Sequence, residues 1–587
     1  MFHQKYFNLQ IIQDDTLDLF FSLFEKAKMI FFDSETSGLA VRAEGKDYIV
    51  GYTFAFEDEV SKDVFYIPIR HDFEGVYKEN NRFKNVPAKF FNKTTFPDFD
   101  KSKFEGEYYN VDSYEFAQRL KPLMEDGHRT YIAHNIDFDL HAIANEGISI
   151  PKVFINNIIE DTQVMVHTVD ETVEKNLEAV TKMLFGVEKS HYSEVIKTVT
   201  NDEKIEAGIK ANANAEFEQV QIPIGGQYSA EDVWFMKQMF PQLVQALKDD
   251  GMYEYYKNVR IPYLKVLWKM ERKGFRIDLE LLDKMSAEAA EEIKKMEYDL
   301  YKLAGVEFNP SSGQNLYELL FGFKKKTVKL NENAQKMYDE VSANLDTKDK
   351  LKYKKQLMTD KNNVEFVESF NEKLVENNFG FKPVEWTDGG QYKYDELKTP
   401  KVGKDELKKL LRQKVSEKSH KFIESLVDYK KLIKLKSAFM DGLKEHIYND
   451  GKVHCSFNLC GTDSYRLSCQ YVNLQQLPHP LEEPKAGEDR TYFDFWERFE
   501  IRKLFIADEG YSVVAADYHA LEKFLTAHLS QDKMLIRMMR ENLDPHGTVA
   551  TIVFPELANV NPNDVKKVAP EKRQIAKKIG FAKGMVK

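Results

Sequence analysis

The sequence predicts a multidomain protein of the α/β class. Its 587 residues exceed what one hydrophobic core usually holds, and roughly 100 to 200 residues per domain suggests three or four domains. Short apolar segments typical of strands gather in residues 28–69 and again in 452–517, with long helical patterns between and after them. That order indicates two α/β regions joined by a helical middle part.

Composition sets further limits on class and location. The hydrophobic share of 42% and charged share of 30% are typical of a soluble globular protein, and no apolar run reaches the roughly 18 residues of a membrane span. The first residues, MFHQKYFNLQIIQDD, lack the pattern of an export signal, so we expect a cytoplasmic protein with no membrane contact. A net charge of -11 does not exclude nucleic acid, because phosphate binding depends on local basic surface.

The three cysteines are predicted to be reduced thiols. Cys455, Cys460 and Cys469 lack the paired short spacings of a zinc site. They are also too few for a disulfide scaffold.

The first domain is expected over residues 1–250. Apolar or alternating runs at 28–36, 48–56 and 63–69 predict three neighbouring strands. A further apolar stretch lies at 130–133, and helical patterns cover 111–126 and 228–249. Together these elements predict a mixed α/β domain.

The rest of the chain is expected to form three parts. Residues 251–450 carry helical patterns at 253–273, 279–303 and 418–446, interrupted over about 324–400 by a lysine-rich stretch that we interpret as an irregular insertion or a loosely packed subdomain. Residues 451–530 return to strand-like runs at 452–457 and 501–517. Helices are expected over 531–587.

Three pairs of polar residues in the first domain have spacings that place each pair on one face. The pairs are Asp33 with Glu35, Asn135 with Asp139, and Tyr228 with Asp232. Residues two apart on a strand share a face, and residues four apart on a helix share a side. Any one pair alone is more often a solvated turn or an exposed helix surface than a site.

The four carboxylates suit divalent metal ions. Hard cations need several oxygen ligands, and two ions about 3.5 to 4 Å apart can hold the attacking and leaving oxygens of a phosphodiester. Asp33, Glu35, Asp139 and Asp232 supply such oxygens from three separate segments, and Tyr228 has a hydroxyl that can orient an attacking water. We therefore expect two Mg²⁺ (or Mn²⁺) ions here.

In this order, the motifs Asp33-x-Glu35, Asn135-x3-Asp139 and Tyr228-x3-Asp232 resemble those of the proofreading 3'-5' exonuclease domain of the DEDDy type. The resemblance covers about residues 28–245. It implies a ribonuclease H-like fold that hydrolyses single-stranded 3' ends of DNA. Asn135 would then contact DNA and Phe138 and Tyr228 are candidates for base stacking, although Phe138 fits a core position equally well.

Two later segments resemble the palm of family A DNA polymerases. They are Thr462-Asp-Ser-Tyr-Arg466-Leu-Ser-Cys, followed by Val-Asn473-Leu-Gln475, and Asp517-Tyr-His-Ala-Leu-Glu522. The resemblance implies that Arg466, Asn473 and Gln475 contact primer-template. It also implies that Asp517, at the end of an apolar strand, binds metal and that Glu522 excludes a ribose 2'-hydroxyl. Tyr465 stands where the family usually has glycine, which can occupy a backbone conformation that tyrosine resists.

The last segments resemble the fingers and thumb of the same family. Asp544-Pro-His546 and Arg573-x3-Lys577-x3-Phe581 match its fingers motifs, which implies that His546, Arg573, Lys577 and Phe581 bind an incoming deoxynucleoside triphosphate. Cations suit a triphosphate and an aromatic ring suits a base, whereas the alternative is a solvated basic helix face. In the thumb, Lys434 and Lys436 would meet duplex phosphates.

The resemblance therefore implies an exonuclease domain followed by an incomplete right-hand polymerase with thumb, partial palm and partial fingers. The family's last palm motif, with a second metal-binding aspartate, is not found before the sequence ends. Because nucleotide transfer depends on two held metal ions, we expect poor polymerisation by this chain alone. An intron or intein, a split gene with a second chain supplying the C-terminal palm, and a truncated record stay open as explanations.

The expected function is that of a phage-type family A DNA polymerase with a proofreading exonuclease, acting in phage or bacterial DNA replication. DNA primer-template, single-stranded 3' ends and deoxynucleoside triphosphates are its expected partners and substrates. The alternative is a non-catalytic DNA-binding fragment or a subunit of a split polymerase. The four acids argue against that alternative, because clamping DNA requires cations.

Overall fold

The computed structural model of the chain divides into two compact units, Met1–Ala507 and Asp508–Lys587. The residues that the structure describes are 6–57, 62–72, 87–88, 108–206, 210, 213–343, 347–484, 488–518 and 521–584. Among these residues, no helix is both long and apolar enough to cross a membrane. Cys455, Cys460 and Cys469 are buried free thiols, as predicted.

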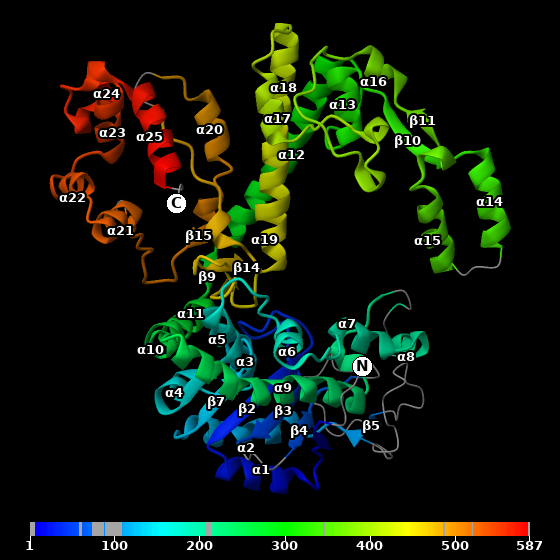
Figure 1. The fold of residues 1–587 in the computed structure, drawn as a ribbon, viewed down its shortest axis with the longest axis vertical. Coiled ribbons are helices and arrows are strands. Elements are labelled where there is room, and N and C mark those ends of the chain that lie inside the picture. Colours follow the sequence, from blue (N-terminus) through cyan, green and yellow to red (C-terminus); the bar gives the residue numbers. More distant parts are fainter. Residues whose placement is uncertain are drawn as a thin grey trace. The chain divides into compact units, whose positions relative to one another are not determined.

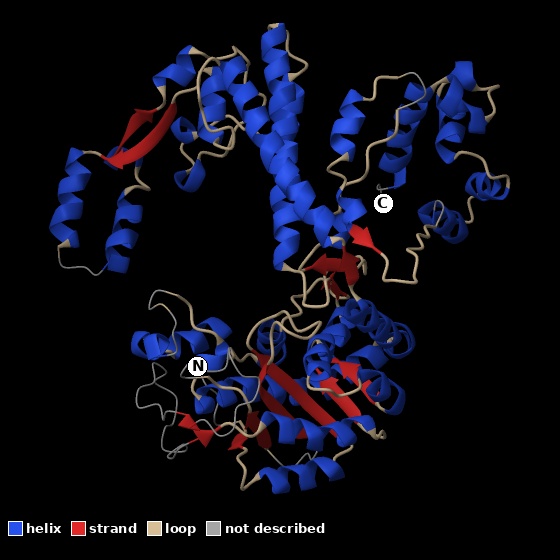
Figure 2. Cartoon of the chain, turned by 180° about the vertical axis from the view of Figure 1, so that it is seen from behind, coloured by secondary structure: helices blue, strands red, loops and turns tan. Residues whose placement is uncertain are grey.

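A six-stranded sheet forms the centre of the first domain (Figure 2). Its order is β1 (Asn8–Ile11), β4 (Asp63–Pro68), β3 (Ile49–Phe56), β2 (Met29–Thr36), β7 (Thr130–Ala133) and β8 (Ile158–Asp161). β3 is antiparallel to β2 and β4, and the other pairs are parallel. The three strands predicted from the apolar runs at 28–36, 48–56 and 63–69 are therefore confirmed, and the further apolar stretch at 130–133 forms β7.

Helices cover this sheet and complete its core. The long helix α9 (Ile222–Asp249) contacts β2, β3 and β4, and Figure 1 shows it lying across the sheet. Gly226 permits this close approach, because a Cβ there would lie 2.9 Å from the Tyr66 ring. The other helices are α1 (Leu17–Lys26), α2 (Ser113–Glu125), α3 (Ile136–Asn145), α4 (Ile150–Asn156), α5 (Thr162–Val169), α6 (Leu177–Phe185), α7 (Tyr192–Val195) and α8 (Asn201–Glu206).

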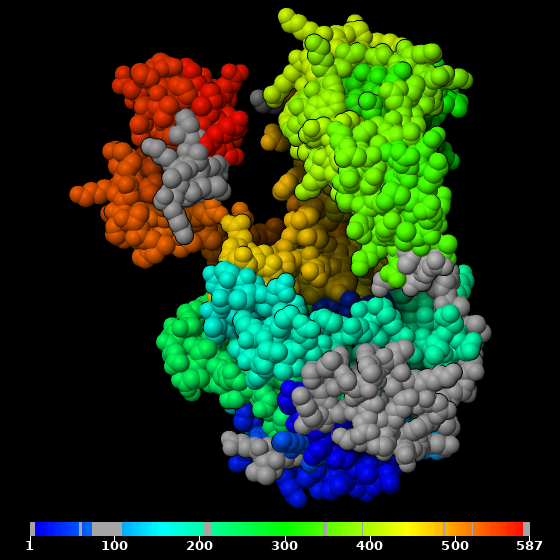
Figure 3. All heavy atoms as spheres, turned by 45° about the vertical axis from the view of Figure 1, so that its right-hand side comes forward, coloured from blue at the N-terminus to red at the C-terminus, as the bar shows by residue number. Residues whose placement is uncertain are grey.

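The core of this domain extends beyond residue 250. Trp268 of α11 (Ile261–Lys273), together with Leu459 and Cys460, belongs to the same cluster of buried side chains as the sheet. In Figure 3 the gold surface of the chain near residue 460 borders the cyan surface of the first domain. Short elements of residues 253–260, namely α10 (Tyr253–Tyr255) and a π-helical turn (Tyr256–Arg260), connect α9 to α11.

Two long helices dominate the middle part of the first unit. α12 (Leu279–Ala304) packs against α18 (Glu417–Lys434). α18 continues through a π-helical turn (Leu435–Asp441) into α19 (Gly442–Glu445). The helical patterns predicted for these segments are confirmed. Smaller helices beside them are α13 (Gly313–Phe321), α16 (Glu372–Glu376) and α17 (Lys404–Leu410).

The lysine-rich stretch is more regular than predicted. Strands β10 (Lys325–Leu330) and β11 (Val364–Ser369) pair antiparallel, with α14 (Glu332–Ser342) and α15 (Thr347–Leu357) between them. A small separate core of Leu330, Ala334 and Leu357 supports these elements. Where the structure describes their burial, the lysines that suggested an irregular segment lie at exposed and half-buried positions, as a charged helix or strand face requires.

Short strands complete the first unit. β9 (Phe275–Ile277) pairs with β12 (Lys452–Val453) and β15 (Phe505–Ile506), and β13 (Ser456–Asn458) forms a hairpin with β14 (Ser468–Gln470). α20 (Thr491–Glu497) lies between β14 and β15 in the sequence.

The second unit is helical, and one prediction for it is wrong. Residues 508–518 have no regular secondary structure, so the strand expected to end at Asp517 is not formed. Val513 is 63% exposed and Val514 is 86% exposed, and no described strand pairs with them. An extended segment without a neighbouring strand leaves its backbone hydrogen-bonding groups to solvent. The helices are α21 (Leu521–Ser530), α22 (Lys533–Arg540), α23 (Pro545–Val553), α24 (Val565–Val568) and α25 (Pro570–Gly584).

Candidate nuclease site and polymerase segments

Three of the predicted acids meet at one point of the sheet. Asp33 and Glu35 project from the same face of β2, and Asp232 comes from the middle of α9. Their carboxylate oxygens lie within 4.8 Å of one another. Three carboxylates that converge in this way supply the oxygen ligands that hard divalent cations prefer.

The fourth acid, Asp139, lies beside this group on α3. Its Oδ1 atom accepts hydrogen bonds from the backbone N–H of Ser34 (2.9 Å) and from the Ser34 hydroxyl (2.6 Å). Ser34 stands between Asp33 and Glu35 on β2, so this contact ties α3 to the strand that carries the other two acids. All four predicted acids are thus in one neighbourhood, with Asp139 held by the serine.

Burial makes this group of acids costly to ionise. Desolvation raises the pKa of Asp33 to about 6 and the pKa of Asp232 to about 7. For Glu35, desolvation and then the charges of Asp33 and Asp232 raise the pKa well above its ordinary value. For Asp139, desolvation and the charge of Asp33 act in the same direction. Bound divalent cations would offset both effects, so these residues fit a metal site.

Lys189 is a member of this site that the sequence analysis missed. Its Nζ atom contacts the carboxylate of Asp232 and lies 4.6 Å from the centroid of the Tyr228 ring. The Lys189 side chain is only 2% exposed. Although burial acts to lower the pKa of Lys189, the Asp232 carboxylate raises it. No spacing pattern marks this residue, because it lies between helices α6 and α7 and approaches the site only in the folded chain.

Tyr228 lies one helical turn before Asp232 and faces the acids. It packs against Phe217 and Tyr192, with ring centroids 6.0 and 6.4 Å away. Desolvation, followed by the charge of Asp232, raises the pKa of Tyr228 well above its ordinary value. The phenol is therefore neutral at physiological pH and keeps its proton for hydrogen bonding.

Asn135 and Phe138 line a separate cavity of about 150 Å³. Asn135 has a left-handed backbone (φ 69°) before α3, and its backbone N–H donates to Asp161 (3.3 Å). The cavity wall also includes Gln470 and Tyr471, from the segment that resembles a polymerase palm. Phe138 packs partly against the core of the first domain and also lines this cavity, a position that fits both a core role and base stacking.

A second acidic group, not expected from the sequence, joins the first domain to later residues. Glu271 of α11 lies 2.9 Å from Arg42 Nε and 3.1 Å from His141 Nε2, and it accepts a hydrogen bond from the backbone N–H of Phe457. Asp137 and His141 bring oxygen and nitrogen atoms within 4.8 Å of it. Arg42 already neutralises the carboxylate, so the group is best described as a buried ion network.

The residues predicted to contact primer-template lie in exposed turns or at helix ends. Arg466 and Gln475 are exposed, and the side chain of Asn473 accepts a hydrogen bond from the backbone N–H of Gln475 (3.1 Å). At the end of α18, Lys434 is exposed, whereas Lys436 forms an ion pair with Asp441 (2.6 Å).

In the second unit, several of the predicted nucleotide-binding residues converge. Arg573 of α25 donates to Asp544 (Nη2 to Oδ1, 3.0 Å), and Asp544 accepts from the backbone N–H of His546 at the start of α23. Burial, followed by the charge of Lys523, lowers the pKa of His546, and the charges of Arg573 and Lys577 act in the same direction. Lys523 is a basic residue that the sequence analysis did not single out for this site.

The other predicted residues of this unit lie in the irregular segment, in α21 and in α25. Asp517 is exposed in the irregular segment, and Glu522 is exposed at the start of α21. Phe581 belongs to α25, but its side chain lies outside the described residues.

Comparisons with known proteins agree with the order of the two sites. Residues 99–248 match the family model described as 3'-5' exonuclease, and residues 389–584 match the model described as DNA polymerase family A. The exonuclease match includes Asp139, Tyr228 and Asp232 and begins after Asp33 and Glu35.

Similar proteins cover nearly the whole chain at low identity. DNA polymerase I of Borreliella burgdorferi is 24% identical over 566 residues, which are 96% of this chain and 45% of that protein. DNA polymerase I of Pseudomonas aeruginosa is 23% identical over 583 residues, which are 97% of this chain and 47% of that protein. The chain thus spans about half the length of these relatives.

A solved structure shares the fold. The POL domain of Pol1 from M. smegmatis, in complex with DNA primer-template and dNTP, superposes with a TM-score of 0.58 at 18% identity, over 97% of this chain and 70% of that one. With an exonuclease match followed by a polymerase match in the order that its motifs predict, the chain belongs to the family A DNA polymerases that carry a 3'-5' exonuclease domain.

Proposed function

We propose that the chain removes nucleotides from single-stranded 3' ends of DNA in a reaction that depends on Mg²⁺ or Mn²⁺. The convergence of the Asp33, Glu35 and Asp232 carboxylates within 4.8 Å carries this proposal. These three residues and Asp139 would hold the ions, whose positive charge stabilises the attacking and leaving oxygens of the phosphodiester. A DNA-clamping subunit needs no such group of acids.

The chain's own residues have distinct tasks in this reaction. The neutral hydroxyl of Tyr228 orients the attacking water, because the phenol keeps its proton beside the acids. Ser34 holds Asp139 against β2 and so fixes the distance between α3 and the strand. The Lys189 ammonium, next to Asp232, neutralises part of the negative charge and favours approach of the DNA phosphate.

For the later segments, we propose the polymerase role of the family. Arg466, Asn473, Gln475, Lys434 and Lys436 would contact DNA primer-template. A deoxynucleoside triphosphate would be bound by His546, Arg573, Lys577 and Phe581. Asp517 would bind a metal ion, and Glu522 would exclude nucleotides that carry a ribose 2'-hydroxyl. The basic cluster of the second unit supports the triphosphate assignment, since several cations gather around one helix start there.

The experiment uses a 5'-labelled primer on a longer template with Mg²⁺, with and without deoxynucleotides, and resolves product lengths. We expect shortening of the primer by the parent chain and its loss in the double variant Asp33→Ala with Glu35→Ala. The matched control replaces the exposed acids Asp14 and Asp15 by alanine and should leave shortening unchanged. Equal shortening by the parent and the Asp33/Glu35 variant would refute the site.

A further inference from the structure

A tyrosine in the loop before β14 has an unusual backbone conformation. Tyr465 has φ of 59°, in the left-handed region that side chains other than glycine and asparagine seldom occupy. A non-glycine residue persists there only when its surroundings hold it. The hydrogen bond and the ring contacts of the Tyr465 side chain come from the part of the chain before residue 261, whereas its backbone N–H donates to Thr462 of the same loop (3.3 Å).

Two residues of that part, His167 and Arg260, make the nearest contacts of the Tyr465 side chain, and the Tyr255 ring lies further away (centroids 6.4 Å apart). The Tyr465 hydroxyl donates to the backbone carbonyl oxygen of His167, at the end of α5 (3.1 Å), and its ring centroid lies 4.7 Å from that of the His167 imidazole. The guanidinium carbon of Arg260 lies 4.7 Å from the ring centroid, in the position of a cation–π contact. Arg260 is only 3% exposed, so this contact is buried.

His167 and Arg260 also hold the neighbouring backbone of the same loop. The Nε2–H of His167 donates to the carbonyl oxygen of Thr462 (3.0 Å), which leaves Nδ1 to accept from Arg260 Nη2 (2.7 Å). Arg260 Nη2 also donates to the carbonyl oxygen of Leu459 (3.3 Å). Together, the two hydrogen bonds of the imidazole require a neutral ring with its proton on Nε2, so these contacts are mutually consistent.

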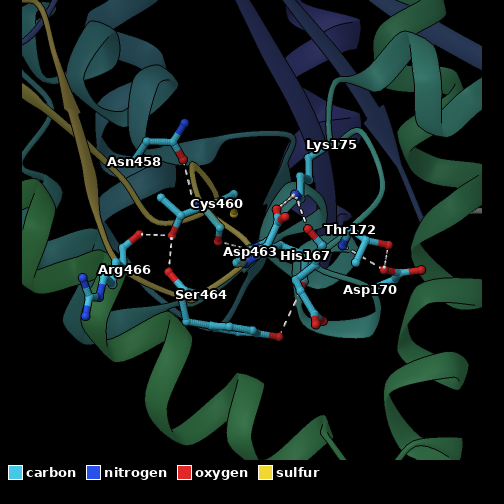
Figure 4. Close-up of polar contacts among 12 residues, drawn as sticks. His167, Asp170, Thr172, Lys175, Asn458, Cys460, Asp463, Ser464 and Arg466 are labelled. Carbon is cyan, nitrogen blue, oxygen red and sulfur yellow. Dashed lines mark hydrogen bonds and ion pairs between the residues drawn. The ribbon is translucent and has the colours of Figure 1, made fainter. Parts of the chain in front are cut away.

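The same loop ends at Arg466. The hydroxyl of Thr462 donates to the carbonyl oxygen of Arg466 (2.7 Å), and Lys175 lies 3.8 Å from Asp463. Figure 4 shows the Arg466 side chain pointing away from His167 and Lys175, on the opposite side of the loop. The loop is thus anchored on one side by the exonuclease part of the chain and presents an exposed arginine on the other.

We propose that Tyr465 is a positioning residue that couples the exonuclease domain to primer-template binding by fixing the backbone from which Arg466 extends. This inference rests on the proposed contact of Arg466 with DNA. It predicts that the ring of Tyr465 matters for DNA affinity although the ring itself faces His167 and Arg260. Glycine would tolerate the same φ but would lack the anchor.

The test measures the dissociation constant of the full chain for a fluorescent primer-template by anisotropy. All variants carry Asp33→Ala with Glu35→Ala, so that the DNA stays intact. We expect Tyr465→Ala and Tyr465→Gly each to weaken binding about fivefold, the size of effect seen when coupled neighbours are removed. Tyr465→Phe, which keeps the ring contacts, should stay within about twofold of the parent. Tyr263→Ala, at an exposed tyrosine of α11, is the matched control and should bind like the parent.

A double-mutant cycle separates positioning from a general loss of structure. If Tyr465 acts through Arg466, then Tyr465→Ala combined with Arg466→Ala binds no more weakly than Arg466→Ala alone. Additive losses would overturn the proposal. So would parent-like binding by Tyr465→Gly, because the backbone conformation alone would then suffice.

The same data distinguish this proposal from the one on which it rests. If Arg466→Ala binds like the parent, the proposed DNA contact of Arg466 is wrong and the coupling is overturned with it. If Arg466→Ala weakens binding and the Tyr465 variants do not, only the coupling is wrong. Thermal unfolding of each variant identifies any that fails to fold, and the phenylalanine and glycine variants then carry the comparison.

Discussion

Replacing Asp33 by asparagine should stabilise the metal-free protein at neutral pH. Burial raises the pKa of Asp33 from 3.8 to about 6, so ionisation of the folded protein is less favourable than ionisation of the unfolded chain. At about 1.4 kcal/mol per pKa unit, this difference amounts to about 3 kcal/mol at pH 7.5. An amide has no charge to desolvate, so up to about 3 kcal/mol of unfolding free energy should be gained.

The gain should depend on pH and on metal in defined directions. Because the folded pKa is raised, protonated Asp33 contributes stability that is complete below pH 3.8 and lost as pH rises through about 6. The advantage of asparagine should therefore fall to about 0.5 kcal/mol at pH 4 and be complete above about pH 7. Mg²⁺ should stabilise the parent more than the variant, because the variant lacks one ligand.

Urea unfolding with EDTA and with Mg²⁺, at pH 4, 5.5 and 7.5, measures these differences. The control is Asp15→Asn, at an exposed acid, which should change stability by less than about 0.5 kcal/mol at every pH. A variant that is less stable than the parent in EDTA at pH 7.5, or equally more stable at pH 4, would refute the account of Asp33 as a desolvated acid.

Three other substitutions test contacts described above. Lys189→Met removes the buried cation beside the acids and should lower the unfolding free energy of the metal-free protein by about 3 to 5 kcal/mol, as measured in urea. Glu271→Ala leaves Arg42 buried without its partner and should cost a similar amount, visible as a lower Tm in calorimetry. Asp544→Ala removes the cap of α23 and the partner of Arg573, and circular dichroism should show a loss of about 1 to 2 kcal/mol.

Each of these three predictions has a result that would contradict it. Unchanged urea midpoints for Lys189→Met would mean that solvent reaches the acids freely. A Glu271→Ala protein as stable as the parent would mean that Arg42 finds another acceptor, and an unchanged melting curve for Asp544→Ala would mean that α23 needs no cap. Exposed acids replaced in parallel, Asp15 for the first two and Glu509 for the third, report the effect of removing surface charge alone.

The parts of the site predicted from sequence are those with local periodicity. Asp33 and Glu35 follow the alternation of a strand, and Tyr228 and Asp232 follow the turn of a helix, so their shared faces were predictable. Lys189 was not predictable, because it comes from an irregular segment and meets Asp232 only through tertiary packing. The strand expected before Asp517 failed for a related reason, since an apolar run forms a strand only when a partner strand is available.

The middle of the chain is the opposite case, because regular structure forms where the sequence predicted an irregular segment. Lysine-rich composition suggested irregular structure, yet β10, β11 and two helices form there because a few apolar residues, including Leu330 and Leu357, give them a core of their own. The composition of a segment is determined mainly by its many exposed residues, whereas a small core depends on a few buried apolar residues. The sequence likewise showed only that a tyrosine replaces the usual glycine at position 465. Its backbone conformation could not be predicted, because it depends on tertiary contacts with His167 and Arg260.

The buried network around Glu271 has a practical consequence for dividing the protein. A recombinant fragment that stops near residue 250 would contain Arg42 and His141 but not the Glu271 carboxylate that contacts both of them, and it would expose the surface that Trp268, Leu459 and Cys460 cover. Residues 456–460 would be needed as well, although they lie some 200 positions further along the chain. The first domain and the residues up to 460 therefore share one core, and residue 250 is not a safe place to divide the chain.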